Sequence, residues 1–140
     1  MSETIHASCV AIAGRAVLIA GPSGSGKSDL SARMLDRGAQ LVSDDYTCLE
    51  AKGGQLLASP PPTIAGRIEL RGVGIVSRAH LAGVPVALLV DLGRPPERLP
   101  EPQAVHLAGI AIPSIGFTAL EASAPIKLEA ALHLLGRPCL

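Results

Sequence analysis

Uninterrupted apolar runs alternate along the chain with segments that are rich in glycine and proline. The clearest runs are residues 8–13, 16–20 and 84–92. Short apolar runs bounded by turn residues are typical of strands that are buried on both faces of a sheet. Shorter strand-like stretches occur at residues 40–43 and 105–115, the second broken by glycine and proline. The pattern therefore predicts a chain built mainly from strands.

Helical spacing of apolar residues occurs in two segments. Residues 28–37 carry leucine and methionine on one face, with an acidic residue in the first turn, and Gly38 follows where a helix commonly ends. A terminal helix is expected to start at residue 120 or 126 and to run to residue 135, where Gly136 would cap it. Few helices are therefore expected beside many strands.

Glycines mark two further features. Gly53-Gly54 separates the strand-like residues 46–51 and 55–58, which predicts a β-hairpin. Residues 64–76 mix glycines with β-branched residues, which predicts one strand with a bend. We find no internal repeat or linker, so residues 1–140 are expected to form a single domain.

The composition excludes several classes of protein. Hydrophobic residues make up 48% of the 140 residues, and the single Phe and single Tyr require an aliphatic core. Twelve basic and twelve acidic side chains cancel, which disfavours binding to nucleic acid or to an anionic membrane. No apolar run reaches the ~18 residues of a membrane helix, and the first ten residues do not resemble a signal peptide. A cytoplasmic protein with idle thiols at Cys9, Cys48 and Cys139 is expected.

A glycine-rich segment between a predicted strand and a predicted helix has the spacing of a Walker A phosphate loop. Main-chain N–H groups of such a loop converge on phosphate oxygens, and the helix N-terminus adds to their field. In this motif the lysine contacts the β- and γ-phosphates of a nucleotide, and the following hydroxyl binds Mg²⁺. The nucleotide-binding residues are predicted to be Gly21, Pro22, Ser23, Gly24, Ser25, Gly26, Lys27 and Ser28.

Two adjacent carboxylates, Asp44 and Asp45, end the predicted strand at residues 40–43. One carboxylate at this place can bind Mg²⁺ next to Ser28, and the other can accept a proton from an incoming hydroxyl. A phosphate loop alone does not name a reaction. The guanine-reading motif of GTPases and the arginine-rich lid of small-molecule kinases are both absent from this sequence, and the chain is short for a transport ATPase.

Four segments together resemble the C-terminal catalytic domain of HPr kinase/phosphorylase, in a short, truncated form. They are His6, the phosphate loop, LVSDD at residues 41–45 and GRIELRGVGIV at residues 66–76. The resemblance covers residues 5–90 and implies an α/β fold, a P-loop kinase core of the phosphoenolpyruvate-carboxykinase type with a mixed twisted sheet. It also implies an ATP-dependent serine kinase that acts on an HPr-like phosphocarrier protein, requires Mg²⁺ and forms a homo-oligomer, commonly a hexamer.

The resemblance implies a role for each matching site residue. Asp44 would be the general base, His6 would lie beside the carboxylate pair, and Lys27 would act on the transferred phosphoryl group. Ser28, Asp45 and Glu69 would surround the metal. Glu69 stands alone in an apolar segment, where a buried carboxylate needs a cation or a donor; a salt bridge to a neighbouring arginine is the alternative.

One departure from the family leaves part of the activity open. The family carries an arginine motif before its last helices, whereas residues 124–128 here contain Lys127 as their single cation. Lysine lacks the bidentate geometry with which arginine grips phosphate. Removal of phosphate from the carrier is therefore left open. A non-catalytic ATP-sensing regulatory module and a small-molecule kinase remain as alternatives to the protein kinase.

Overall fold

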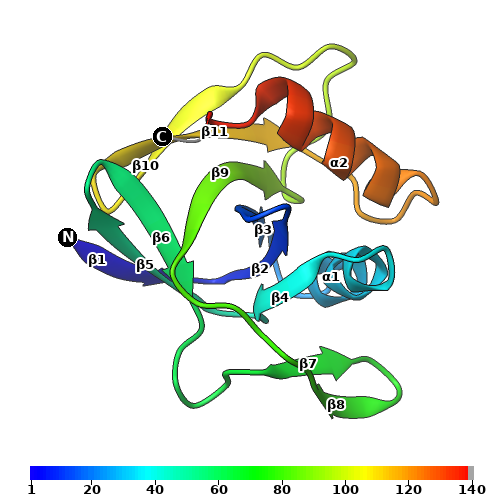
Figure 1. Ribbon diagram of the computed structural model, residues 1–140. Helices are drawn as coiled ribbons and strands as arrows, with labels where there is room; N and C mark the ends of the chain where they lie inside the picture. Colours follow the sequence, from blue (N-terminus) through cyan, green and yellow to red (C-terminus); the bar gives the residue numbers. More distant parts are fainter. Residues whose placement is uncertain (139–140) are drawn as a thin grey trace.

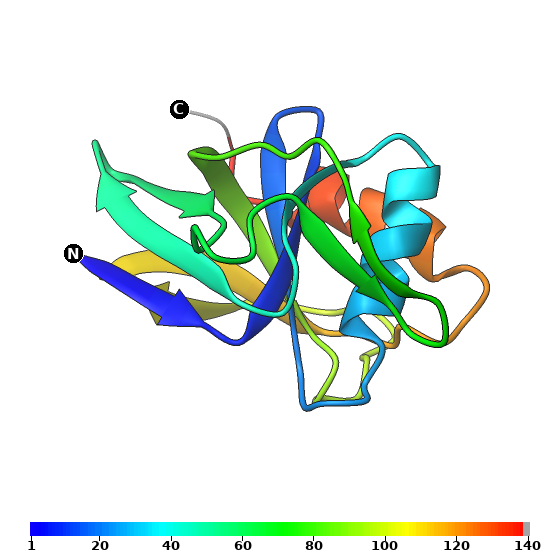
Figure 2. The same ribbon diagram turned by 90° about the horizontal axis from the view of Figure 1, so that it is seen from below.

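The computed structural model describes residues 1–138, which form eleven strands and two helices (Figures 1 and 2). Most strands are short, as expected from the many glycine-rich turns. In chain order the elements are β1 (Ser2–Ile5), β2 (Ala7–Ile12), β3 (Arg15–Ala20), α1 (Lys27–Asp36), β4 (Gln40–Ser43), β5 (Thr47–Lys52), β6 (Gln55–Ser59), β7 (Arg67–Leu70), β8 (Gly74–Ser77), β9 (Val84–Asp91), β10 (Gln103–Leu107), β11 (Ile110–Gly116) and α2 (Ala124–Leu135).

Strand β9 is shared by the two halves of a curled, mixed sheet. The strand order is β1-β5-β6-β9-β3-β2-β4, and β11 also pairs with β9 and carries β10. The first two residues of β9, Val84 and Pro85, pair with β6, whereas the rest of the strand pairs with β3. The sheet therefore curls at this strand, and the two helices lie together against one of its faces (Figure 1).

Two apolar clusters hold the sheet, one on each face. Strand β3 contributes to both because its successive side chains point to opposite faces, and its central residues are fully buried, which confirms the prediction for residues 16–20. The cluster under the helices contains, among others, Val10, Val17, Ile19, Leu30, Met34, Leu88, Val90, Phe117 and Leu128. The cluster inside the curl contains, among others, Cys9, Leu18, Val42, Leu49, Leu56, Val86 and Ile112.

The predicted helices and the first hairpin are confirmed, with differences at their ends. Helix α1 ends at Asp36, two residues before Gly38, whose φ is 103°. The N–H groups of Gly38 and Ala39 donate to main-chain carbonyls of the last turn. Helix α2 starts at Ala124, between the two expected positions. Gly136 has an ordinary φ of −66°, and glycine is needed there because a Cβ would lie 2.5 Å from the Leu132 carbonyl oxygen.

Three sequence-based predictions need correction. Residues 64–76 do not form one bent strand: β7 and β8 make a separate two-stranded hairpin that projects from the body (Figure 1). Strand β1 was not predicted, because its residues are mostly polar and exposed and show no alternation. Pro113 does not interrupt β11, where it pairs with Ala104, and the reversal occurs at Ala108-Gly109.

No helix within residues 1–138 is long and apolar enough to span a membrane.

Replacing Leu18 with alanine is expected to lower the free energy of unfolding by about 3 kcal/mol, because this fully buried side chain leaves a cavity inside the curl. Urea unfolding followed by circular dichroism measures the change. Leu134→Ala is the control, since Leu134 is 75% exposed and its loss should change stability by less than about 0.5 kcal/mol. Equal effects of the two variants would contradict the assignment of this core.

Candidate functional site

The phosphate loop joins β3 to α1 and lies at the edge where the parallel strands β3, β9 and β11 end. Its glycines adopt backbone conformations that other residues reach with difficulty, with φ values of 80° at Gly24 and 101° at Gly26. A Cβ at Gly21 would lie 2.8 Å from Ser25 Oγ and 2.9 Å from Leu92 Cβ. The glycines are therefore required both by the curvature of the loop and by its close packing.

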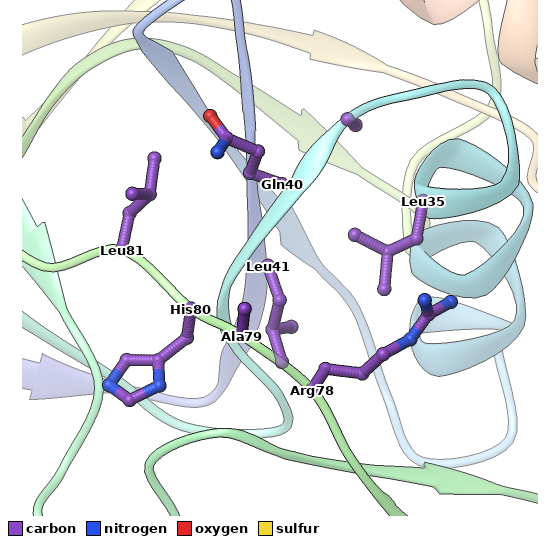
Figure 3. A pocket seen from close by; sticks show the side chains of 8 residues that line it. Leu35, Gln40, Leu41, Arg78, Ala79, His80 and Leu81 are labelled. Carbon is purple, nitrogen blue, oxygen red and sulfur yellow. The ribbon is translucent and has the colours of Figure 1, made fainter.

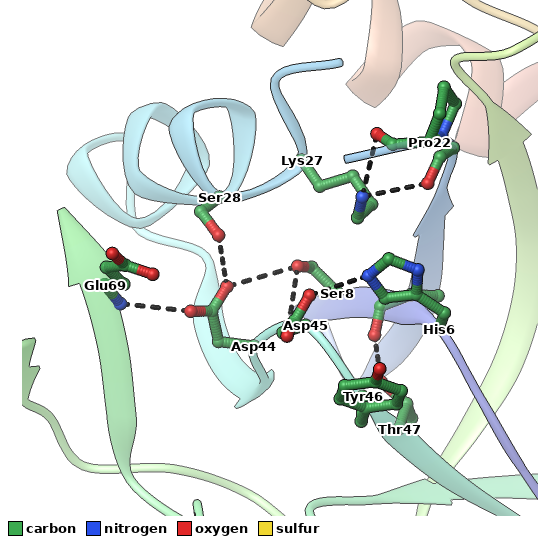
Figure 4. Close-up of polar contacts among 12 residues, drawn as sticks. His6, Ser8, Pro22, Lys27, Ser28, Asp44, Asp45, Tyr46, Thr47 and Glu69 are labelled. Atoms are coloured by element: carbon green, nitrogen blue, oxygen red, sulfur yellow. Dashed lines mark hydrogen bonds and ion pairs between the residues drawn. The ribbon is translucent and has the colours of Figure 1, made fainter. Parts of the chain in front are cut away.

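The lysine of the motif lies inside this loop. Lys27 is 6% exposed, and its Nζ donates to the carbonyl oxygens of Gly21 (2.8 Å) and Pro22 (3.1 Å) (Figure 4). The Ser25 hydroxyl is buried and has no hydrogen-bond partner within residues 1–138. A cation, an unpaired buried donor and a helix N-terminus at one loop fit the phosphates of a nucleotide.

The Asp44 carboxylate, 7% exposed, is enclosed by three donors from different elements (Figure 4). Its Oδ1 accepts from Ser28 Oγ (2.6 Å), on α1, and from Ser8 Oγ (3.2 Å), on β2. Its Oδ2 accepts from the main-chain N–H of Glu69 (3.0 Å), on β7. The projecting hairpin and the phosphate-loop helix are thus joined at this one side chain.

Asp45 faces away from that cluster because the chain reverses at this residue. Its φ is 69°, and the Tyr46 N–H donates to the Asp44 carbonyl oxygen (2.8 Å) in a γ-turn. Asp45 Oδ1 lies 2.8 Å from His6 Nε2, and the side chains are 56% and 38% exposed. The imidazole stacks on Tyr46 with ring centroids 5.0 Å apart. Asp45 is therefore an accessible carboxylate with an imidazole partner (Figure 4).

The structure brings most of the predicted site residues together but pairs them differently from the expected metal set. Ser28 contacts Asp44, whereas Asp45 contacts His6. Glu69 is exposed, so the expectation that its carboxylate needs a cation in a buried strand is wrong. Glu69 contacts the cluster through its main-chain N–H, which donates to Asp44. No group of three or more His, Cys, Asp or Glu side chains within residues 1–138 is arranged to hold a metal.

A magnesium ion still fits this corner. Mg²⁺ commonly takes one or two protein ligands and completes its shell with phosphate oxygens and water. The Ser28 hydroxyl and the Asp44 carboxylate, 2.6 Å apart at the start of α1, provide such a pair of oxygen ligands.

Sequence reasoning missed Ser8. Its side chain is fully buried, and its hydroxyl donates to Asp44 Oδ1 and accepts from the Asp45 N–H (3.1 Å). It therefore fixes both neighbouring aspartates at once. The sequence did contain a signal for this role: Ser8 lies in an otherwise apolar strand, and a buried hydroxyl there needs polar partners.

Two other features lie outside this cluster. A surface pocket of about 240 Å³ lies at the end of α1 that is far from the phosphate loop, between Leu35, the start of β4 and residues 78–81 (Figure 3).

Cys9 is fully buried, and burial raises the pKa of its thiol, which agrees with the expected idle thiols. Cys48 is a half-buried free thiol, and Cys139 lies outside the described residues.

Comparisons with known proteins converge on one family. Residues 1–87 match the family model described as HPr Serine kinase C-terminal domain. Among curated proteins, the HPr kinase/phosphorylase of Clostridium botulinum (strain Eklund 17B / Type B) is 35% identical over 80 residues, which are 57% of this chain and 26% of that protein. The HPr kinase/phosphorylase of Brevibacillus brevis is 44% identical over 83 residues, 59% of this chain and 27% of that protein.

The match therefore spans about a quarter of the length of these curated relatives. A solved structure covers far more of the chain. The Hpr(Ser) kinase/phosphatase from Coxiella burnetii superposes with a TM-score of 0.81 at 32% identity, over 94% of this chain and 94% of that one. The expected kinase-type fold, with a mixed sheet and few helices, is confirmed by this likeness.

Proposed function

Because the chain belongs to the HPr Serine kinase C-terminal domain family, we propose that it transfers the γ-phosphoryl group of ATP to a serine of an HPr-like phosphocarrier protein. The observation that carries the proposal is the meeting of three parts at one edge of the sheet. These parts are the phosphate loop with Lys27, the Ser28–Asp44 contact, and the accessible Asp45–His6 pair.

The nucleotide phosphates would be held by the loop N–H groups and by the Lys27 ammonium group. Mg²⁺ would sit at Ser28 and Asp44, where it neutralises charge on the phosphates. Asp44 replaces Asp45 in the metal set predicted from the sequence, because Asp44 is the carboxylate in contact with Ser28. Glu69 would support the site by holding Asp44 through its main-chain N–H, with its exposed carboxylate available to a metal-bound water.

The general base would be Asp45, whereas the family resemblance had assigned this role to Asp44. Three donors already occupy the oxygens of Asp44, and its 7% exposure leaves little access for an acceptor hydroxyl. Asp45 is reachable, and His6 holds its orientation. In the reaction the serine oxygen bonds to the γ-phosphorus as the bond to the ADP oxygen breaks, and Asp45 takes the serine proton.

Removal of phosphate from the carrier is not part of the proposal. Residues 117–128 hold Lys127 as their single cation. Its Nζ pairs with Glu121 Oε1 at 2.9 Å, so this cation is already neutralised by a carboxylate. The segment therefore offers no free cation for an incoming inorganic phosphate.

Labelled ATP incubated with the chain and an HPr-like carrier tests the proposed function. Label on the carrier is expected, and a carrier whose acceptor serine is replaced by alanine should stay unlabelled. Nucleotide binding without transfer to any acceptor would instead support the ATP-sensing module. Label that appears only in small metabolites would support a small-molecule kinase.

Ser8→Ala is expected to lower the turnover number for serine phosphorylation about tenfold, because both aspartates lose a buried partner. The Kd for MgATP should change less than about threefold, since the phosphate loop is untouched. Ser8→Thr keeps the hydroxyl and should recover most of the rate. Ser114→Ala removes another buried hydroxyl, on β11, and is the control. A matching loss of turnover in the control would remove the specific role of Ser8.

A further inference from the structure

The position of Asp44 determines which way a bound nucleotide extends from the phosphate loop. Strand β3 leads into the loop, and β4 runs parallel to it and ends at Asp44 on one side, two positions away in the sheet. On the other side of β3, the strands β9 and β11 end at the same edge. If the γ-phosphate faces Asp44 and Ser28, the nucleoside leaves towards the segments that follow β9 and β11.

The segment after β11, residues 117–123, is fixed beside the phosphate loop. The Arg33 guanidinium group, on α1, donates to the carbonyl oxygens of Ala119 and Glu121. Lys127 pairs with the Glu121 carboxylate at 2.9 Å. Ala119 is 2% exposed and anchors the segment in the core. These contacts attach the segment to α1 and to the core.

This segment also carries an exposed apolar side chain. Leu120 is 79% exposed although the residue before it is buried. A methyl group added at Gly26, the residue before α1, would lie 3.2 Å from Ala119 Cβ and 3.5 Å from Leu120 Cδ2. Leu120 therefore lies beside Gly26 of the phosphate loop, on the segment that follows β11.

We propose that Leu120 is the apolar surface on which the nucleobase of the bound nucleotide packs. A purine has apolar faces, and covering them together with an exposed leucine removes apolar surface from water. The surface is continuous with the phosphate loop, so one nucleotide reaches both. Pre-formed segments of this kind lose little conformational entropy on binding. This inference rests on the proposed function, because it takes the triphosphate to occupy the loop.

Isothermal titration of two ligands tests the contact. MgATP carries a base, and magnesium tripolyphosphate carries the same chain of three phosphates without a nucleoside. Leu120→Ala is expected to weaken MgATP binding about tenfold and to leave tripolyphosphate binding within about twofold. Leu120→Phe restores a broad apolar face and should recover most of the MgATP affinity. Leu134→Ala, at a leucine that is 75% exposed in the last turn of α2, should change neither affinity.

The outcomes separate this inference from the proposed function. Unchanged MgATP binding in Leu120→Ala would overturn the base contact. An equal loss of affinity for both ligands would also overturn it, because the substitution would then have disturbed the phosphate loop itself. A wild-type chain that binds MgATP more tightly than tripolyphosphate but never labels a carrier would overturn the kinase and keep the base contact. A wild-type chain that binds neither ligand would overturn both.

Discussion

Asp45→Asn is expected to lower the rate of serine phosphorylation by about 10³-fold and to leave the Kd for MgATP within about twofold. The amide cannot accept the serine proton, whereas asparagine tolerates the left-handed φ of 69° and can still hydrogen-bond to His6. Single-turnover transfer of label to the carrier measures the rate, and titration calorimetry measures the affinity.

Asp44→Asn is the comparison that separates the two aspartates. This variant is expected to weaken magnesium-dependent nucleotide binding, because Ser28 and the proposed magnesium ion lose their carboxylate partner. Full transfer by Asp45→Asn, together with loss of transfer at unchanged affinity in Asp44→Asn, would restore Asp44 as the base.

Lys27→Ala is expected to lower both MgATP affinity and transfer, the second by about 10³-fold. The substitution removes the single cation inside the loop and its two contacts with the carbonyl oxygens of Gly21 and Pro22. The nucleotide-induced rise in melting temperature should disappear as well. Lys52→Ala, at an exposed lysine on β5, is the control and should keep both properties. MgATP affinity retained within threefold in Lys27→Ala would mean that the nucleotide does not use this loop.

The central unit of the fold was predictable because several independent signals agree there. Residues 16–20 form an uninterrupted apolar run, the loop after them has fixed spacing, and the next segment has helical periodicity. The hairpin at Gly53-Gly54 was predictable for a related reason, since both glycines adopt the positive φ that a two-residue turn demands. Local chemistry alone decides such elements.

The hairpin of β7 and β8 shows where local patterns fail. Val73 and Ile75 belong to β-branched types that usually pack inside, and the sequence of residues 64–76 suggested one strand with a bend. In the structure they are 80% and 70% exposed, and the chain reverses between Leu70 and Gly74. Burial of an apolar side chain depends on what the rest of the fold places over it, and a sequence window does not contain that information.

The candidate site was predictable in its membership but not in its pairing. The motif and the family resemblance selected Lys27, Ser28, Asp44, Asp45 and His6, all of which lie at one corner. Which aspartate meets Ser28 depends on the γ-turn at Asp45, because that turn sends two neighbouring side chains in different directions. The serine in a buried strand marked Ser8 as a residue that needs polar partners, but it did not identify those partners, which are 36 and 37 residues away.

Because the backbone at Asp45 is left-handed, a substitution that raises thermal stability there would also remove the proposed base. An aspartate in this conformation costs folding free energy that glycine would not. Selection for survival at higher temperature would therefore favour glycine at this position, and the same exchange would delete the carboxylate. With Asp45 in its proposed role as the base, the most thermostable variants from such a screen are expected to lose serine phosphorylation, so melting temperature is a poor guide when choosing improved forms of this chain.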